Sequence, residues 1–132
     1  MPQFNSIVLK DGQSTPVDHT FTPRGIEDGV ATLVETNGVP IGESRITLSQ
    51  SRNSNGRIRA VVKFAVPVVQ DVVVGGVTKP TVVRVNYVDL TFNFENTSSV
   101  VERATMMNYV ATAFASTQSM IKNYIVNLEG LY

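Results

Sequence analysis

Five of the eleven cationic side chains of this chain fall within residues 45–67, although the formal net charge of the whole chain is zero. No acidic residue occurs in residues 44–70. Guanidinium and ammonium groups gathered in this way can bind the phosphates of a nucleic acid. Because the net charge is zero, we expect phosphate binding at a local patch and not general binding of polyanions by the whole surface. The five cations are Arg45, Arg52, Arg57, Arg59 and Lys63.

Side chains for catalysis or metal binding are sparse. The chain has no cysteine and one histidine, His19, so disulfides, thiolate metal sites, cysteine nucleophiles and a histidine pair for zinc are excluded. Asp18 adjoins His19, but no serine motif or metal-ligand spacing accompanies them, which favours a surface or turn histidine. The Gly-Gly sequence at 75–76 lacks the lysine and Ser/Thr of a phosphate loop. We predict that the protein is not an enzyme and uses no metal, cofactor or small-molecule substrate.

The length of 132 residues predicts a single domain, residues 1–132. The N-terminus lacks the basic start and apolar run of a signal peptide. No apolar stretch approaches the roughly 20 residues of a membrane helix. We therefore expect a soluble, cytoplasmic chain that does not enter a membrane.

The elements that must position the cations are mostly strands. Valine supplies 22 of the 132 residues, and β-branched side chains favour strands. Turn signals such as Asn37-Gly38 and Asn55-Gly56 separate six predicted strands, at residues 6–10, 17–23, 29–36, 44–51, 57–66 and 81–95. Since each strand is expected beside its sequence neighbour, the sheet is predicted to be antiparallel.

The C-terminal part has helical periodicity. Ser99 and Glu102 form a capping-box pattern that predicts a helix start, and apolar residues follow at helical spacing. A second helix is predicted in residues 119–130, with Gly130 as its stop signal. Two helices of about twelve residues span only roughly 18 Å each, a thin cover for such a sheet. This and the apolar segment 66–83 predict self-association, the alternative being a well-buried strand pair.

Strand parity sorts the cationic hairpin into two faces. An apolar row contains Ile46, Leu48, Ile58, Val62, Phe64 and Val66. The other face contains Arg45, Thr47, Ser49, Arg57, Arg59, Val61 and Lys63, while Arg52 near the turn is not assigned. If the turn centres on Ser54, Arg45 opposes Lys63, Thr47 opposes Val61 and Ser49 opposes Arg59.

Like charges directly opposite each other are destabilising, so this pairing indicates a role beyond stability. In the last strand Tyr87 and Asp89 form a polar row. Cations for phosphates, hydroxyls for base edges and an aromatic ring for stacking are typical of a nucleic-acid platform. An ordinary solvated sheet face is the alternative that the pattern leaves open.

The chain as a whole resembles the coat proteins of the small single-stranded RNA bacteriophages, the leviviruses, from about residue 4 to Tyr132. The resemblance is carried by the order and spacing of NSIVLKD, TPRGIEDGVATLVE, GVPIGESRITLS, SNGRIRAVVKFAVPVV, VGGVTKP, VRVNYVDLTF and IVNLEGLY. It implies an α+β fold with an N-terminal β-hairpin, a five-stranded antiparallel sheet and two C-terminal α-helices. It also implies an interlocked dimer, in which the helices of each chain cover the sheet of its partner.

The resemblance further implies an obligate homodimer that assembles in the bacterial host cytoplasm into the virion capsid, a T=3 icosahedral shell around the single-stranded RNA genome. A loop over residues 68–81 would meet its copies at the symmetry axes, with Gly75, Gly76 and Pro80 matching the family pattern. A Gly-Gly pair permits the more than one loop shape that such packing needs.

The resemblance also implies that the polar face binds a genomic RNA hairpin and represses replicase translation. Tyr87 would stack a base, Thr47 and Ser49 would hydrogen-bond an unpaired adenine, and the cations would contact phosphates or support the pocket. Val61 and Asp89 stand where some members have threonine and asparagine, so a different RNA target is expected. The runner-up function is a non-viral dimeric RNA-binding sheet module. The site carried over by position comprises Val30, Arg45, Thr47, Ser49, Arg57, Arg59, Val61, Lys63, Tyr87 and Asp89.

Overall fold

A computed structural model describes residues 1–36 and 40–132 of the chain. The predicted turn at Asn37-Gly38 lies outside the described residues. The chain forms two compact units, Met1–Asn93 and Phe94–Tyr132. That the whole chain acts as one domain stays a prediction.

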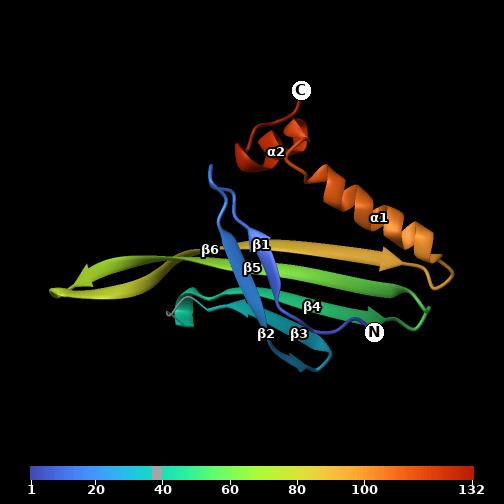
Figure 1. The fold of residues 1–132 in the computed structure, drawn as a ribbon, viewed down its shortest axis with the longest axis horizontal. Helices are drawn as coiled ribbons and strands as arrows, with labels where there is room; N and C mark the ends of the chain where they lie inside the picture. The colour runs from blue at the N-terminus through green and yellow to red at the C-terminus, as the bar shows by residue number, and fades with distance from the viewer. Residues whose placement is uncertain (37–39) are drawn as a thin grey trace. The chain divides into compact units, whose positions relative to one another are not determined.

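The first unit is built from antiparallel strands, each beside its sequence neighbour, as predicted (Figure 1). A short 3-10 helix, Pro40–Gly42, precedes the fourth strand. The sheet order follows the chain from β1 to β6. The strands are β1 (Ile7–Lys10), β2 (Asp18–Glu27), β3 (Val30–Glu35), β4 (Ser44–Arg52), β5 (Ile58–Val74) and β6 (Val77–Phe94).

The N-terminal hairpin and the five-stranded sheet share β2. Residues 18–21 of β2 pair with β1, whereas residues 22–27 pair with β3. An irregularity between Pro23 and Gly25 lies within the second part, close to where the pairing changes, and such a bulge bends a strand. This sharing explains why six strands form one sheet where an N-terminal hairpin and a five-stranded sheet were predicted, and the predicted fold class is confirmed.

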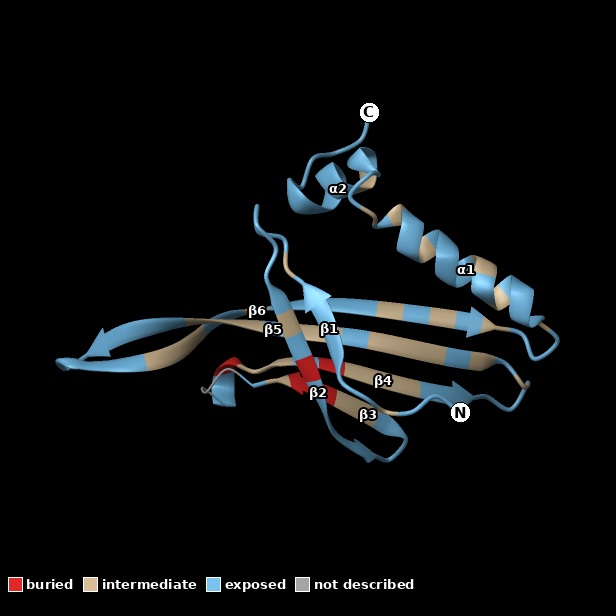
Figure 2. Ribbon diagram, viewed as in Figure 1, coloured by how far each residue is buried: buried red, intermediate tan, exposed pale blue. Residues whose placement is uncertain are grey.

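The core of the first unit lies where this hairpin crosses the sheet (Figure 2). Phe21 of β2, Leu33 of β3 and Ile46 of β4 are buried there. Fully burying a side chain of this size contributes about 1.5–3 kcal/mol, so the cluster holds the hairpin against the sheet. Four partly buried side chains pack around it, and three of them belong to the predicted apolar row: Phe4, Leu48, Val62 and Phe64.

The turn between β4 and β5 corrects the predicted register. The Gly56 amide donates to the Asn53 carbonyl at 3.0 Å, and the Asn53 amide donates to the Arg57 carbonyl at 2.9 Å. Gly56 has a φ of 78°, so a three-residue loop with a glycine bulge closes the hairpin. The hairpin therefore centres on Asn55 and not on Ser54, and the predicted opposition of Arg45 and Lys63 is wrong.

The β5–β6 hairpin is longer than predicted. The two strands continue to Val74 and from Val77, so the predicted loop over residues 68–81 is wrong. Only Gly75 and Gly76 connect them, with φ values of 60° and 81°. Left-handed geometry at both central residues suits a two-residue turn whose twist matches the strands. Pro80 lies within β6, the edge strand of the described sheet, where a missing N–H is tolerated.

The second unit contains α1 (Val100–Ala113) and α2 (Ser119–Val126). The predicted capping box is confirmed, since the Glu102 amide donates to Ser99 Oγ at 3.2 Å and the Ser99 amide donates to Glu102 Oε2 at 2.7 Å. The second helix ends at Val126 with Asn127 as its C-cap, and Leu128 follows with a φ of 58°, so the stop predicted at Gly130 is wrong. Within the described chain no helix is long and apolar enough to cross a membrane.

Candidate nucleic-acid interface

The predicted site residues of β3, β4 and β5 lie in rows across the sheet. Val30, Ser49 and Val61 form one row, because Ser49 of β4 pairs with both valines. The next row contains Thr32, Thr47 and Lys63. Directly opposite residues have Cβ atoms about 4.5–5.5 Å apart, so each member can share a ligand with its neighbour. The Ser49 hydroxyl thus lies between two valines, and the Thr47 hydroxyl lies beside a lysine.

The cations of this face alternate with uncharged residues. Arg45 opposes Ala65, Lys63 opposes Thr47 and Arg59 opposes Ser51. Because no two cations stand directly opposite each other in this pair of strands, the like-charge penalty inferred from the sequence does not arise. The face therefore tolerates its positive charge without a bound anion.

These cations are also not neutralised by acids within the described residues. The ion pairs found there join Lys10 to Asp18, His19 to Asp11 and Glu35, and Arg24 to Glu43. Arg45, Arg57, Arg59 and Lys63 are all exposed. Their charged groups are therefore available to an external anion such as an RNA phosphate.

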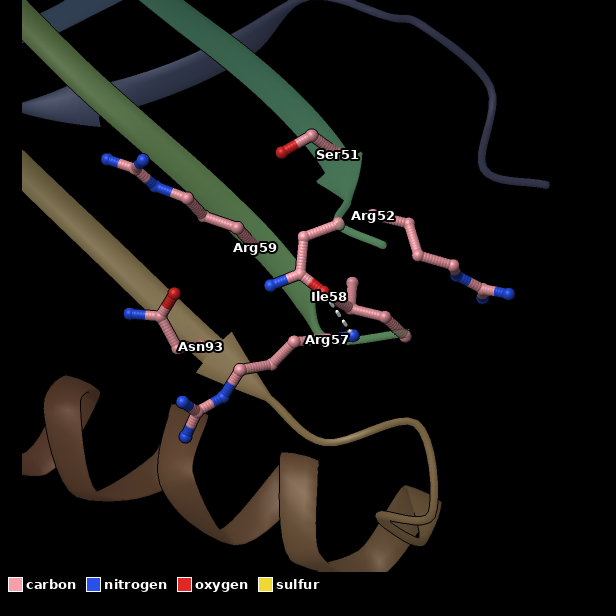
Figure 3. Close-up of a pocket in the computed structure, with 7 residues that line it drawn as sticks. Ser51, Arg52, Arg57, Ile58, Arg59 and Asn93 are labelled. Atoms are coloured by element: carbon pink, nitrogen blue, oxygen red, sulfur yellow. Dashed lines mark hydrogen bonds between the residues drawn. The ribbon is translucent and has the colours of Figure 1, made fainter. Parts of the chain in front are cut away.

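An open groove of about 470 Å³ lies at the turn end of this face. Figure 3 shows Arg57, Arg59 and Asn93 extending to one side of the sheet, while Arg52 extends to the other. Strand parity in the sequence did not assign Arg52 to a face. In the structure its side chain does not lie on the polar face. The groove is lined by Ser51, Arg52, Asn53, Arg57, Ile58, Arg59 and Asn93.

The Asn53 side chain shapes the entrance of this groove. Its Oδ1 accepts from the Arg57 amide at 2.8 Å and from the Asn55 amide at 3.1 Å. Local amide acceptors of this kind are typical of asparagine in turns. Asn53 thereby fixes the backbone that carries Arg57.

β6 contributes the aromatic part of the face. Asn93 lies beside the arginines of β5, and strand parity places Asp89 and Tyr87 on the same face as Asn93. Tyr87 is 70% exposed, so its ring can be reached by a base. The structure thus brings together the predicted residues of β3, β4 and β5, and strand parity adds those of β6.

Two groove residues with polar side chains on this face, Ser51 and Asn93, were absent from the predicted site. Ser51 and Asn93 belong to the polar rows of β4 and β6, and both line the groove. Extending strand parity to the ends of the strands would have included them. Amide and hydroxyl groups beside two arginines add donors and acceptors for a base edge.

The predicted assembly residues lie at the opposite end of the same hairpin. β5 contains 17 residues, which span about 55 Å at the usual rise of a strand. Gly75 and Gly76 form the turn at its far end, where four exposed valines surround them. The predicted RNA-binding residues and the predicted assembly residues can therefore be altered separately. The valines are Val72, Val73, Val74 and Val77.

The amino-acid sequence is similar to those of known capsid proteins. The family described as Levivirus coat protein matches residues 2–132. The capsid protein of Pseudomonas phage PRR1 is 45% identical over 130 residues, which cover 98% of this chain and 99% of that protein.

Solved structures agree with the fold. A virus-like particle of bacteriophage NT-214 superposes with a TM-score of 0.84 at 20% identity, covering 99% of this chain and 100% of that one. An unassembled virus coat protein dimer, described as a bacteriophage RNA-binding dimer, has a TM-score of 0.57 at 22% identity, with 98% of each chain covered.

Proposed function

This chain belongs to the levivirus coat protein family, and from that premise we propose that its polar sheet face binds an RNA hairpin of the phage genome. The protein is a structural component of the virion capsid and not an enzyme. This membership sets aside the alternative of a non-viral RNA-binding module. In the proposal, hairpin binding represses translation of the replicase, and the remaining basic face packages the single-stranded RNA.

The observation that carries the proposal is the set of unneutralised cations on one face. Arg45, Arg57, Arg59 and Lys63 have no ion-pair partner within the described residues and share their face with hydroxyls and with Tyr87. A face with a purely structural role gains nothing from leaving these charges unpaired. Phosphates bind the cations, and a loop base stacks on the exposed tyrosine ring.

The rows of the sheet make the two hydroxyl positions chemically unequal. Ser49 lies between Val30 and Val61, so neither of its two cross-strand neighbours carries a hydroxyl. Thr47 lies between Thr32 and Lys63, which supply a second hydroxyl and a cation. An adenine bound at Thr47 therefore has more polar partners than one bound at Ser49, and we expect the RNA target to require only one tightly read adenine.

Self-association is the second part of the proposal. Most apolar side chains of α1 and α2 are exposed in the single chain, including Met107, Phe114 and Tyr124. Monomeric proteins rarely expose apolar surface on this scale. An obligate homodimer, in which the helices of each chain cover the sheet of its partner, buries these side chains. Such dimers assemble in the host cytoplasm into a T=3 shell, with Gly75, Gly76 and Pro80 near its symmetry axes.

The RNA site is tested with Tyr87→Ala. A hairpin is first selected from a random library with the unaltered protein, and its affinity is then measured for the variants. Loss of stacking removes about 1–3 kcal/mol, which is roughly a 5- to 150-fold loss of affinity. Tyr87→Phe keeps the ring and serves as the matched control, with an affinity close to that of the unaltered protein.

Shell assembly of these variants is followed by light scattering. Particles of unaltered mass are expected, because Tyr87 lies on the RNA face and not on the valine-rich tip. Equal hairpin affinity of Tyr87→Ala and the unaltered protein would refute the stacking role. A stable dimer that never forms particles would refute the shell.

A further inference from the structure

His19 lies between two carboxylates that come from different parts of the chain. Its Nδ1 is 2.6 Å from Glu35 Oε1 at the end of β3. Its Nε2 is 2.9 Å from Asp11 Oδ2 in the turn after β1. The imidazole of β2 thus connects the N-terminal hairpin to the sheet on which it packs.

The geometry requires a doubly protonated ring. A neutral imidazole has one N–H donor, and its other nitrogen carries a lone pair. That lone pair would face a carboxylate oxygen at hydrogen-bond distance, which is repulsive. Only the imidazolium donates from both nitrogens, so both contacts exist together only while His19 is charged.

Asp11 is itself held in place by its own turn. Its carboxylate accepts from the Gln13 amide at 3.2 Å, from Gln13 Nε2 at 2.7 Å and from the Val17 amide at 3.0 Å. The carboxylate therefore organises the turn between β1 and β2. Through His19 this turn is tied to Glu35, whose strand contributes Leu33 to the core.

The other charges near His19 do not replace this connection. Lys10 of β1 lines the same pocket, but its Nζ is 2.8 Å from Asp18 Oδ1, so it forms an ion pair there. Asp11 and Glu35 are the two other charged groups of that pocket. When the imidazole loses its proton, one of these two carboxylates loses its partner.

We propose that His19 is a pH-controlled latch, whose imidazolium fixes the N-terminal hairpin to the end of β3 and whose deprotonation loosens the hairpin. The latch acts on the apolar side of the sheet, where Phe21 packs on Leu33 and Ile46, and does not depend on RNA binding.

The pH range of the closed latch follows from two pKa shifts. The hydrogen bond that His19 donates to Glu35, and then the one it donates to Asp11, raises the pKa of His19 above its ordinary value of 6.5. Stability from the raised group is fully present below 6.5 and is lost as the pH rises through the folded value. The hydrogen bond from His19 lowers the pKa of Asp11 from 3.8 to about 2. The stability contributed by Asp11 is therefore present above 3.8 and is lost as the pH falls from 3.8 to about 2. The contributions of Asp11 and His19 are therefore both fully present between 3.8 and 6.5.

Because the chain has one histidine, histidine-selective ¹⁵N spectra report this residue alone. Spectra of the full-length protein, recorded in the solid state where particles form, should show both ring nitrogens protonated below pH 6.5 and a pKa above 6.5. Hydrogen exchange provides the structural readout. Protection factors of β1 and of residues 18–21 should fall several-fold as the pH rises through that pKa, while those of β4 stay constant.

Two substitutions separate the latch from general effects of pH. His19→Lys keeps a positive charge far above neutral pH and should keep the hairpin protected throughout. His19→Gln has no charge and should leave the hairpin less protected at every pH. A pKa of His19 at or below 6.5 overturns the proposal, and that measurement does not depend on whether a variant folds. The same pH-dependent loss of protection in His19→Gln overturns it as well.

Discussion

The salt dependence of RNA binding distinguishes two arginines that lie close together in the same hairpin. Arg59 extends over the polar face beside Asn93, whereas Arg52 extends from the opposite side of the sheet (Figure 3). Both are exposed, and replacing either by alanine removes one positive charge. Any difference between Arg59→Ala and Arg52→Ala therefore reports the position of the charge and not the change in net charge.

The size of the effect follows from counterion release. One phosphate contact changes the slope of log K against log salt by about 0.7 for a single strand and about 0.9 for a duplex. Between 50 and 200 mM salt, that contact accounts for about a 2.6- to 3.5-fold loss of affinity. Arg59→Ala should reduce the salt slope by this amount, and the double variant Arg57→Ala/Arg59→Ala should reduce it about twice as much. Arg52→Ala should leave the slope close to that of the unaltered protein.

Fluorescence anisotropy with one selected hairpin, repeated over this salt range, measures all four slopes under the same conditions. Light scattering of each variant confirms that particles still form, so that a change in assembly is not taken for a change in RNA contact. If Arg52→Ala reduces the slope as much as Arg59→Ala, the polar face makes no localised phosphate contacts. The cations would then act only through the general field of the protein.

Two further predictions concern the turn and the hydroxyl rows. Asn53→Ala removes the acceptor of the Asn55 and Arg57 amides and should lower the free energy of unfolding by about 1–3 kcal/mol, measured by denaturant titration with Ser54→Ala as control. Val61→Thr places a hydroxyl opposite Ser49 and should tighten binding of hairpins with an unpaired adenine by about 2- to 13-fold, measured by anisotropy; an unchanged affinity would show that no adenine binds in this row.

The two faces of the sheet could be predicted from the sequence, although the register of the hairpin could not. The predicted and observed centres, Ser54 and Asn55, differ by one residue, which shifts every cross-strand partner by two. A shift of two positions returns each side chain to its own face, because the side-chain period of a strand is two. The error therefore did not change which residues share a face, as Arg45, Thr47, Ser49 and Lys63 do. It did change the cross-strand partner predicted for each of them.

The register depended on interactions that the sequence leaves open. Asn-Gly is compatible with a two-residue turn and with a three-residue loop that ends in a left-handed glycine. The Asn53 side chain and the bond from Gly56 to Asn53 accompany the longer loop. Similarly, His19 suggested no partner, because Asp11 and Glu35 are 8 and 16 residues away and come together only when the hairpin folds over β3.

The observed register also changes the physical explanation for the positive charge on this face of the sheet. Opposed cations would have destabilised the face in the absence of RNA, which favoured a ligand as the reason for its positive charge. Alternation with Thr47, Ser51 and Ala65 removes that penalty, so the sheet is stable before RNA arrives. Such a preformed face loses little conformational entropy on binding and keeps its charges available for phosphates. Selectivity must then come from the uncharged members of the rows, and the valines on either side of Ser49 are where this chain is expected to depart from relatives that carry threonine at the position of Val61.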